Sequence, residues 1–157
     1  MQQFSYPVTL KRDKRGGYVV TFRDIPEAIT QGENRDDALE QAADALDEAV
    51  AGRMRLGDEI PPPSKGKKSS TLIPLPAATA LKAALYRAIR EAQLSKVALA
   101  ARLGYDEKEV RRLLSPDHAS KLQRIEDVLQ SLGKRIVVSI EDKVAIKRPA
   151  RAISANR

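Results

Sequence analysis

The 157-residue chain contains no cysteine, no tryptophan and only one histidine. The lack of cysteine excludes disulfides, a thiolate nucleophile and a cysteine zinc site, and a single histidine excludes a multi-histidine metal centre. Aromatic residues make up 4% of the chain, which argues against a base-stacking surface for single-stranded nucleic acid. No apolar run approaches the roughly 20 residues that span a bilayer. The amino terminus lacks the pattern of a secretory signal, so we expect a cytoplasmic protein without a membrane partner.

Charge, in contrast, is abundant and unevenly distributed along the chain. The 28 Lys and Arg residues outnumber 21 Asp and Glu residues, for a formal net charge of +7, which favours a polyanionic partner. Residues 1–63 carry 8 basic and 12 acidic side chains, a net charge of −4, whereas residues 64–157 carry 20 basic and 9 acidic ones, a net charge of +11. The two parts are therefore expected to meet partners of opposite charge.

The acidic part begins with two segments in which apolar and polar residues alternate, residues 4–11 and 18–22. This period is typical of half-buried strands, and the glycines at 16 and 17 favour a hairpin between them. Pro7 lacks a donor and favours an edge position for the first strand. We expect a short third strand over residues 28–31.

A helix is expected after these strands. Asn34 can cap its start, acidic residues in the first turn oppose its dipole, and Gly52 or Gly57 ends it. The resulting small antiparallel sheet with one packed helix forms a predicted domain over residues 1–60. A unit of about 60 residues is marginal unless something covers its free surface.

The carboxylates of this domain are candidates for a metal-dependent nuclease site or for a partner surface. A nuclease needs several carboxylates that converge on one point, and the pattern shows no such convergence. The sequence favours a solvated helix face, with a surface for a basic protein as the functional alternative. No catalytic residue, metal ligand or cofactor is assigned, and the candidate partner-binding residues are Asp24, Asp36, Glu40, Asp44, Asp47 and Glu48.

Residues 61–76 are predicted to be a linker, because three prolines are followed by a stretch rich in Gly, Ser and Lys. Residues 71–76 could form an edge strand, since their prolines exclude a central position. Residues 77–93 have the spacing of an amphipathic helix, with Lys82, Arg87 and Arg90 outside its apolar stripe.

The most informative stretch covers residues 94–114. Ser95 can cap a helix that ends at Gly104, and Asp106 can cap a second helix whose outer side is basic. Two short helices joined by a glycine turn predict a helix-turn-helix, whose second helix enters the major groove of double-stranded DNA. An ordinary charged surface on a helical pair is the alternative. The candidate DNA-binding residues are Ser95, Lys96, Glu107, Lys108, Arg111, Arg112 and Lys121.

A further helix is expected over residues 121–132 and a strand over residues 135–141. A lone strand is unstable, so it should pair with the same strand of a second chain or with the segment around Leu72. The candidate dimerisation residues are Ile136, Val138 and Ile140. Residues 77–142 thus form a predicted DNA-binding and dimerisation domain, and residues 143–157 form a basic tail that is expected to be disordered.

The order of these motifs resembles the HicB-type antitoxins of bacterial HicA–HicB toxin–antitoxin systems, over about residues 4–142. The matching segments include Gly16-Gly17-Tyr18-Val19-Val20, Asp24-Ile25-Pro26, Thr30-Gln31-Gly32, Ala38-Leu39-Glu40, Leu85-Tyr86, Val110-Arg111-Arg112-Leu113-Leu114 and Leu132-Gly133-Lys134-Arg135. The resemblance implies a truncated RNase H-like front domain that blocks a small basic ribonuclease toxin, and a back domain that represses the pair's own promoter. A fold similar to RNase H need not bring its chemistry.

The leading hypothesis is therefore an α+β protein that acts as a non-enzymatic antitoxin and autorepressor. It would bind operator DNA as a homodimer or higher homo-oligomer. The alternative is a stand-alone transcriptional regulator whose amino-terminal domain senses a small ligand, which would require an apolar cleft. A third hypothesis, an RNase H-like nuclease, would require cleavage that is lost on Asp24→Asn.

Overall fold

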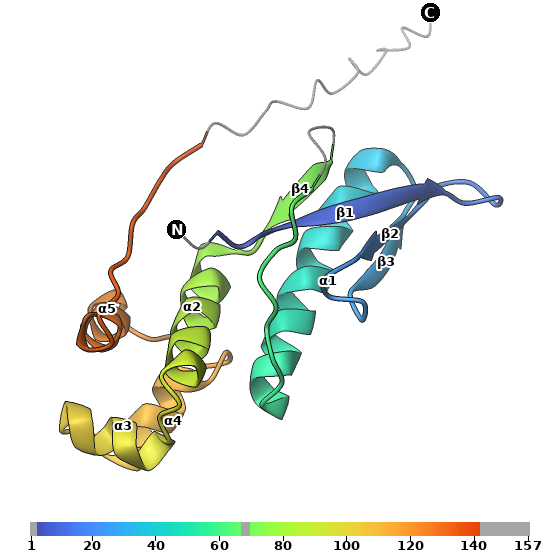
Figure 1. Ribbon diagram of the computed structural model, residues 1–157. Helices are drawn as coiled ribbons and strands as arrows, with labels where there is room; N and C mark the ends of the chain where they lie inside the picture. Colours follow the sequence, from blue (N-terminus) through green and yellow to red (C-terminus); the bar gives the residue numbers. More distant parts are fainter. Residues whose placement is uncertain (1–2, 67–69, 142–157) are drawn as a thin grey trace, which may run out of the picture.

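The computed structural model describes residues 3–66 and 70–141 and shows an α+β protein, as expected (Figure 1). The predicted tail, residues 143–157, lies outside the described residues. Four antiparallel strands form one sheet in the order β3-β2-β1-β4: β1 Ser5–Arg12, β2 Tyr18–Phe22, β3 Ile29–Gly32 and β4 Thr71–Pro74. The helices are α1 Arg35–Leu56, α2 Ala77–Glu91, α3 Lys96–Leu103, α4 Glu107–Leu114 and α5 Leu122–Ser131. Within the described ranges, none of these helices combines the length and the apolar character that a membrane span needs.

Strand β1 is central, so the expectation of an edge position for Pro7 is wrong. β1 pairs with β2 on one side and with β4 on the other. The pairing with β2 begins at Val8, whereas Pro7 lies opposite Leu72 of β4. Pro7 therefore occupies a stretch where β1 has only one neighbour, and such a position tolerates a residue without an N–H donor.

The possible edge strand at residues 71–76 is confirmed as β4. It follows α1 in the sequence and pairs with β1 as the last strand of the sheet. Its residue Ile73 is 6% exposed and joins the core that α1 and the sheet enclose. From α2, Ala83 and Tyr86 join the same core. The small amino-terminal unit thus obtains from β4 and α2 the cover that its size requires.

Helix α2 belongs to two hydrophobic cores at once. Ala83 and Tyr86 face the core of the sheet, whereas Leu85, Ala88 and Ile89 belong to a second core. α3, α4 and α5 supply the rest of the second core, including Leu99, Val110 and Val128. Figure 1 shows α2 between α1 and the carboxy-terminal helices. The predicted boundary at residue 77 therefore coincides with the start of a helix that both parts share.

Gly32 ends β3 where α1 begins and allows the two elements to approach closely. A Cβ atom at this position would overlap the backbone of Ala38 in the first turn of α1. Gly17, just before β2, has φ +78°, and a Cβ there would overlap the carbonyl of Gly32. Only glycine fits at both positions, so the hairpin, β3 and α1 meet at one crowded point.

The strand expected over residues 135–141 is absent from the single chain. These residues form neither helix nor strand, and β4, which contains Leu72, pairs with β1 instead. Ile136 packs partly against the second core, but Val138 and Ile140 are 77% and 95% exposed. Among the described residues this segment pairs with no strand, so its backbone groups form no ladder.

Candidate functional site

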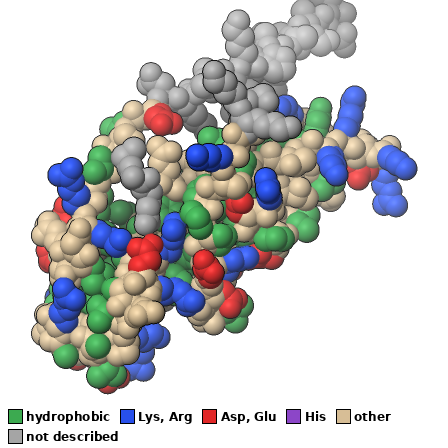
Figure 2. Space-filling model, in the orientation of Figure 1, with side chains coloured by type: hydrophobic (Ala, Val, Ile, Leu, Met, Phe, Trp, Pro, Cys, Tyr) green, Lys and Arg blue, Asp and Glu red, His purple; other side chains and the backbone are tan. Residues whose placement is uncertain are grey.

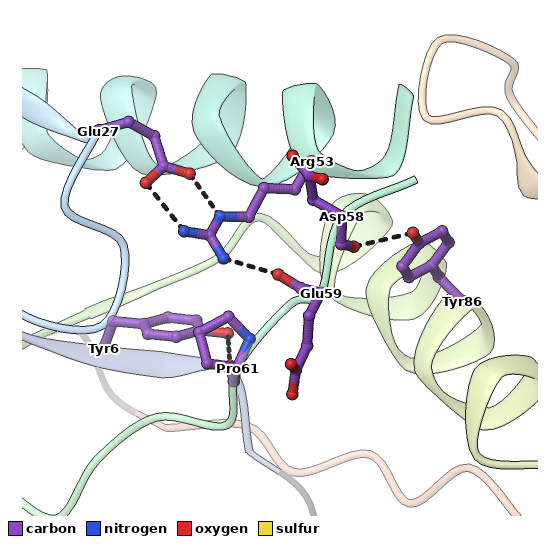
Figure 3. A network of polar contacts seen from close by, with 7 residues as sticks. All are labelled: Tyr6, Glu27, Arg53, Asp58, Glu59, Pro61 and Tyr86. Atoms are coloured by element: carbon purple, nitrogen blue, oxygen red, sulfur yellow. Dashed lines mark hydrogen bonds and ion pairs between the residues drawn. The ribbon is translucent and has the colours of Figure 1, made fainter. Parts of the chain in front are cut away.

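A network of polar contacts holds the chain where it leaves α1 (Figure 3). The guanidinium group of Arg53 pairs with the carboxylate of Glu27, with one N–H donating to Oε2 at 3.0 Å. Another N–H donates to the backbone oxygen of Glu59 at 2.6 Å. The hydrogen bond from Arg53 lowers the pKa of Glu27. Arg53 thereby ties α1 both to the loop after β2 and to the segment that leads toward β4.

Two tyrosines hold the same segment from opposite sides. The hydroxyl of Tyr6, in β1, donates to the backbone oxygen of Pro61 at 2.8 Å, and that of Tyr86, in α2, donates to the backbone oxygen of Asp58 at 2.8 Å. Burial raises the pKa of Tyr6 to about 12. The path of residues 58–61 is therefore fixed between the sheet and α2 (Figure 3).

Four of the six predicted partner-binding carboxylates form one exposed stripe along α1. Asp36, Glu40, Asp44 and Glu48 follow each other at intervals of four residues, so they lie on the same side of the helix. All four are exposed. Only Glu48 has an ion partner among the described residues, Arg55 at 2.8 Å. We call these four residues the acidic stripe.

The other two predicted carboxylates have different surroundings. Asp24 is half-buried, and its carboxylate accepts the backbone N–H of Ser64 at 2.8 Å, so it holds the segment after α1. Asp47 is also half-buried, and its Oδ1 has no hydrogen-bond partner in the described part of the chain. Within residues 3–66 and 70–141, no group of three or more metal-ligating side chains could hold a metal ion. The carboxylates thus give no support to the nuclease hypothesis.

The caps predicted for the two helices at residues 95–114 are confirmed. The hydroxyl of Ser95 accepts the N–H of Ala98 at 3.1 Å, and Gly104 follows α3 in the left-handed conformation, φ +68°. Asp106 and Glu109 form a reciprocal capping box at the start of α4, with distances of 2.7 and 3.2 Å. These caps fix where α3 ends and where α4 begins.

Helix α4 buries Val110 and Leu113 and exposes the basic residues Lys108, Arg111 and Arg112. These three side chains make no hydrogen bond or ion pair with the described residues. The remaining candidates, Ser95, Lys96, Glu107 and Lys121, are also exposed and lie at the starts of α3, α4 and α5.

A groove of about 650 Å³ brings two of these candidates together with cations from other elements. Its lining includes Lys96 and Arg111, together with Arg55 from α1 and Arg90 from α2. The other five candidates are not among its lining residues: Ser95, Glu107, Lys108, Arg112 and Lys121. The candidate DNA-binding residues therefore do not all share one concave surface. Lys108 and Arg112 are exposed on α4 outside this groove.

An ion pair links α1 to the loop after α4. The guanidinium group of Arg55 donates to both carboxylate oxygens of Asp117, at 2.9 and 2.6 Å. The hydrogen bond from Arg55 lowers the pKa of Asp117. Since Arg55 also pairs with Glu48, the end of the acidic stripe is connected through one side chain to the end of α4.

Lys82 is a residue whose role the sequence pattern missed. The helical pattern predicts it outside the apolar stripe of α2, yet it is 6% exposed and is the one buried charged residue in the described part of the chain. Its ammonium group donates to the backbone oxygen of Leu113 at 2.6 Å and to the hydroxyl of Ser120 at 2.7 Å. Desolvation lowers its pKa to about 8. A helix buried on two faces has no single apolar stripe, so helical periodicity alone could not reveal this lysine.

A second missed contact braces the turn between α3 and α4. The guanidinium group of Arg124, in α5, lies 4.6 Å from the ring centre of Tyr105 and 3.6 Å from a carboxylate oxygen of Glu109. No spacing in the sequence relates these residues.

The sequence matches the family described as "HicB_like antitoxin of bacterial toxin-antitoxin system" over residues 5–84. It is 36% identical to Antitoxin HicB 1 of Photorhabdus laumondii over 141 residues, which cover 90% of each chain. It is 37% identical to Antitoxin HicB of Escherichia coli K12 over 131 residues, 83% of this chain and 95% of that one. Antitoxin HicB of Pseudomonas fluorescens is 34% identical over 139 residues, 88% and 94% of the two chains. The chain described here belongs to the HicB antitoxin family.

Proposed function

We propose that this chain binds and neutralises a small basic HicA-type ribonuclease toxin and represses its own operon by binding operator DNA. Membership of the HicB antitoxin family is the observation that carries the first part. In this proposal the chain is a cytoplasmic protein, needs no cofactor and contributes no catalytic residue. The amino-terminal domain of residues 1–60 would be a truncated RNase H-like unit. Residues 77–142 would contain the helix-turn-helix.

The acidic stripe is the proposed centre of the toxin-binding surface. A row of exposed carboxylates suits a basic partner, because complementary charge raises the rate of association and suppresses wrong partners. Asp36, Glu40 and Asp44 are all exposed and have no ion partner among the described residues, and Glu40 and Asp44 are the two central members of the stripe. Asp24 and Asp47 remain weaker candidates because they are half-buried.

Co-expression of the full chain with the small open reading frame next to its gene tests this part. We expect the neighbour to be toxic alone, to be neutralised by the full chain and to co-purify with it. The variant Glu40→Lys/Asp44→Lys should lose most of this protection. The matched control Glu33→Lys/Glu59→Lys, which reverses two exposed carboxylates outside the stripe, should keep it. A neighbour that is harmless alone, or that does not co-purify with the full chain, would contradict the proposal.

The exposed basic face of α4 supports the proposed operator contact. Arg presents a fork of donors that matches the edge of guanine, so Arg111 and Arg112 are the candidates for base contacts. Ser95 and Lys96, at the start of α3, and Lys121, at the start of α5, are proposed to contact phosphates. Glu107 could accept from a cytosine amino group.

Operator binding is tested with DNA from the chain's own promoter. The double variant Arg111→Ala/Arg112→Ala should lose most specific binding, since one base-contacting Arg is worth about 1–3 kcal/mol. Arg23→Ala, which removes an exposed cation from the amino-terminal unit, is the control and should bind nearly as the parent does. Unchanged binding by the double variant would show that α4 is not the reading helix.

Residues 135–141 are proposed as the dimer contact. Val138 and Ile140 are exposed apolar residues of a segment that alternates like a strand, and pairing with its copy would bury them. The variant Val138→Lys/Ile140→Lys should shift the molar mass measured by light scattering from an oligomer to a monomer. A parent chain that is monomeric at all concentrations would contradict this part.

A further inference from the structure

A buried ammonium group donates hydrogen bonds to backbone oxygens at the carboxy-terminal end of α4. The last four backbone oxygens of an α-helix have no partner within the helix and are satisfied by other groups. In α4, the oxygens of Arg112 and Leu113 lie 3.4 and 2.6 Å from Nζ of Lys82. A cation at this end is also favoured by the helix dipole. Lys82 therefore supplies the hydrogen-bond donors at the end of α4, the helix that carries the exposed Arg111 and Arg112.

The same ammonium group also holds the chain beyond α4. Nζ of Lys82 donates to the hydroxyl of Ser120, 2.7 Å away, in the connection between α4 and α5. With three acceptors around it, the charged group is hydrogen-bonded in three directions, as a buried ammonium requires. Lys82 thus fixes α4 and the following loop relative to α2.

Helix α2 is itself fixed to the amino-terminal unit next to Lys82. Ala83 lies in the core of the sheet, and Tyr86 donates to the backbone oxygen of Asp58. The lysine therefore lies on an element whose position is set by the amino-terminal core, while its ammonium group reaches α4 in the carboxy-terminal part.

We propose that Lys82 is a positioning residue for α4: it sets the orientation of this helix relative to α2 and so places Arg111 and Arg112 for sequence-specific DNA contact. The inference rests on the proposed operator binding. It predicts that Lys82 affects the discrimination between operator and unrelated DNA, although its side chain is buried and does not touch DNA. A buried charge that served only stability would not change that discrimination.

The test compares binding of the full chain to its own promoter fragment and to an unrelated fragment of equal length. Lys82→Met keeps the length of the side chain and removes its donors. It should weaken operator binding by about tenfold or more while non-specific binding changes by less than about twofold. Lys82→Arg, which keeps a cationic donor, should restore part of the discrimination. Lys134→Met removes a partly exposed lysine that pairs with Glu91 at 2.8 Å and controls for the lost charge.

Ser120→Ala provides a milder variant if Lys82→Met does not fold. It removes one acceptor and leaves the two backbone oxygens in place, so we expect a loss of discrimination that is smaller than that of Lys82→Met. Equal losses of specific and non-specific binding, or unchanged binding in both variants, would overturn the inference.

Hydrogen exchange separates this inference from the operator proposal. If the parent chain does not prefer its promoter fragment, the proposed function fails, but the structural step can still be measured. Lys82→Met should accelerate amide exchange in α4 and leave exchange in α1 unchanged. Unchanged exchange in α4 would overturn the positioning role whether or not the chain binds DNA.

Discussion

The two parts of the molecule are built from different kinds of contact around one shared helix. The amino-terminal core joins strands that are far apart in sequence, since Ser5 of β1 pairs with Pro74 of β4. The carboxy-terminal core consists of consecutive short helices, α2 to α5. Figure 2 shows both charge signs spread over the surface, although the net charges of the two parts are −4 and +11. The parts differ in charge and in contact range, but both use α2 in their cores, so we expect them to unfold together.

The largest effect is expected when one buried leucine in each core is replaced by alanine. Leu46 and Leu99 are both 0% exposed, one in each core. Leu46→Ala and Leu99→Ala should each lower the free energy of unfolding by about 2–5 kcal/mol. Because α2 belongs to both cores, calorimetry should show one cooperative transition for the parent chain, shifted as a whole in each variant. Two separate transitions, each sensitive to only one substitution, would show that the parts unfold independently.

A smaller effect, confined to the amino-terminal part, is expected at Gly32. Gly32→Ala should lower the free energy of unfolding by about 1–3 kcal/mol, because the added Cβ must displace the first turn of α1. The control is Gly52→Ala within α1, where a Cβ meets nothing within 4 Å. That variant should gain about 0.5–1 kcal/mol. Denaturant titration measures the free energy of unfolding of both variants. If Gly32→Ala leaves it unchanged, the crowding at the β3–α1 junction is contradicted.

The connection between the parts is tested at Tyr86. Tyr86→Phe keeps the ring in the core and removes the hydroxyl that bonds to Asp58, so it should cost about 0.5–1.5 kcal/mol. Amide exchange of the residues around Asp58 should increase at the same time. Tyr18→Phe is the control, since its hydroxyl has no hydrogen bond in the described part of the chain. If Tyr86→Phe and Tyr18→Phe lower the free energy of unfolding equally, the Tyr86 hydroxyl does not connect the two parts.

The smallest effect concerns pH and the ion pair of Glu27. Arg53 lowers the pKa of Glu27 below its value in the unfolded chain, so the pair contributes stability above the unfolded pKa. This contribution is lost as the pH falls through the folded pKa. The glutamate side chain is 46% exposed, so the difference between the parent chain and Glu27→Gln at pH 7 should stay below about 1 kcal/mol. The difference should vanish in acid and shrink in high salt, and a difference independent of pH would contradict it.

Sequence patterns correctly predict those features that depend only on residues close together in the chain. The caps at Ser95, Gly104 and Asp106 are correct because a cap is formed by residues within one helical turn. The half-buried alternating strand expected over residues 18–22 is confirmed as β2, in which Val20 and Phe22 are buried and the other residues of the strand are partly exposed. The order of motifs along the chain indicates the right family, because each motif is a short local signal that can be read without the fold.

Errors arise where the outcome depends on distant parts of the chain. Pro7 is expected at an edge because its own donor is missing, but which strands flank β1 depends on β4. Lys82 is expected outside the apolar stripe because periodicity describes one buried face, whereas α2 buries two. The alternating pattern of residues 135–141 shows a capacity to pair but does not identify the partner. Pairing with the segment around Leu72 is not observed, since that segment pairs with β1, and pairing with a second chain stays a prediction.

The fourth strand of the amino-terminal sheet, β4, comes after the proline-rich segment, and this position matters when the chain is divided into fragments. A piece that stops at the prolines, residue 63, would leave the Ser5–Val8 stretch of β1 without β4 and its core without Ile73, and an uncovered edge of this kind recruits other strands. Conversely, two fragments that separate between Ile60 and Thr71 would still carry complementary edges, β1 on one and β4 on the other. We expect such halves to reassemble when mixed, so the chain is better suited to split-protein complementation than to isolation of its amino-terminal half.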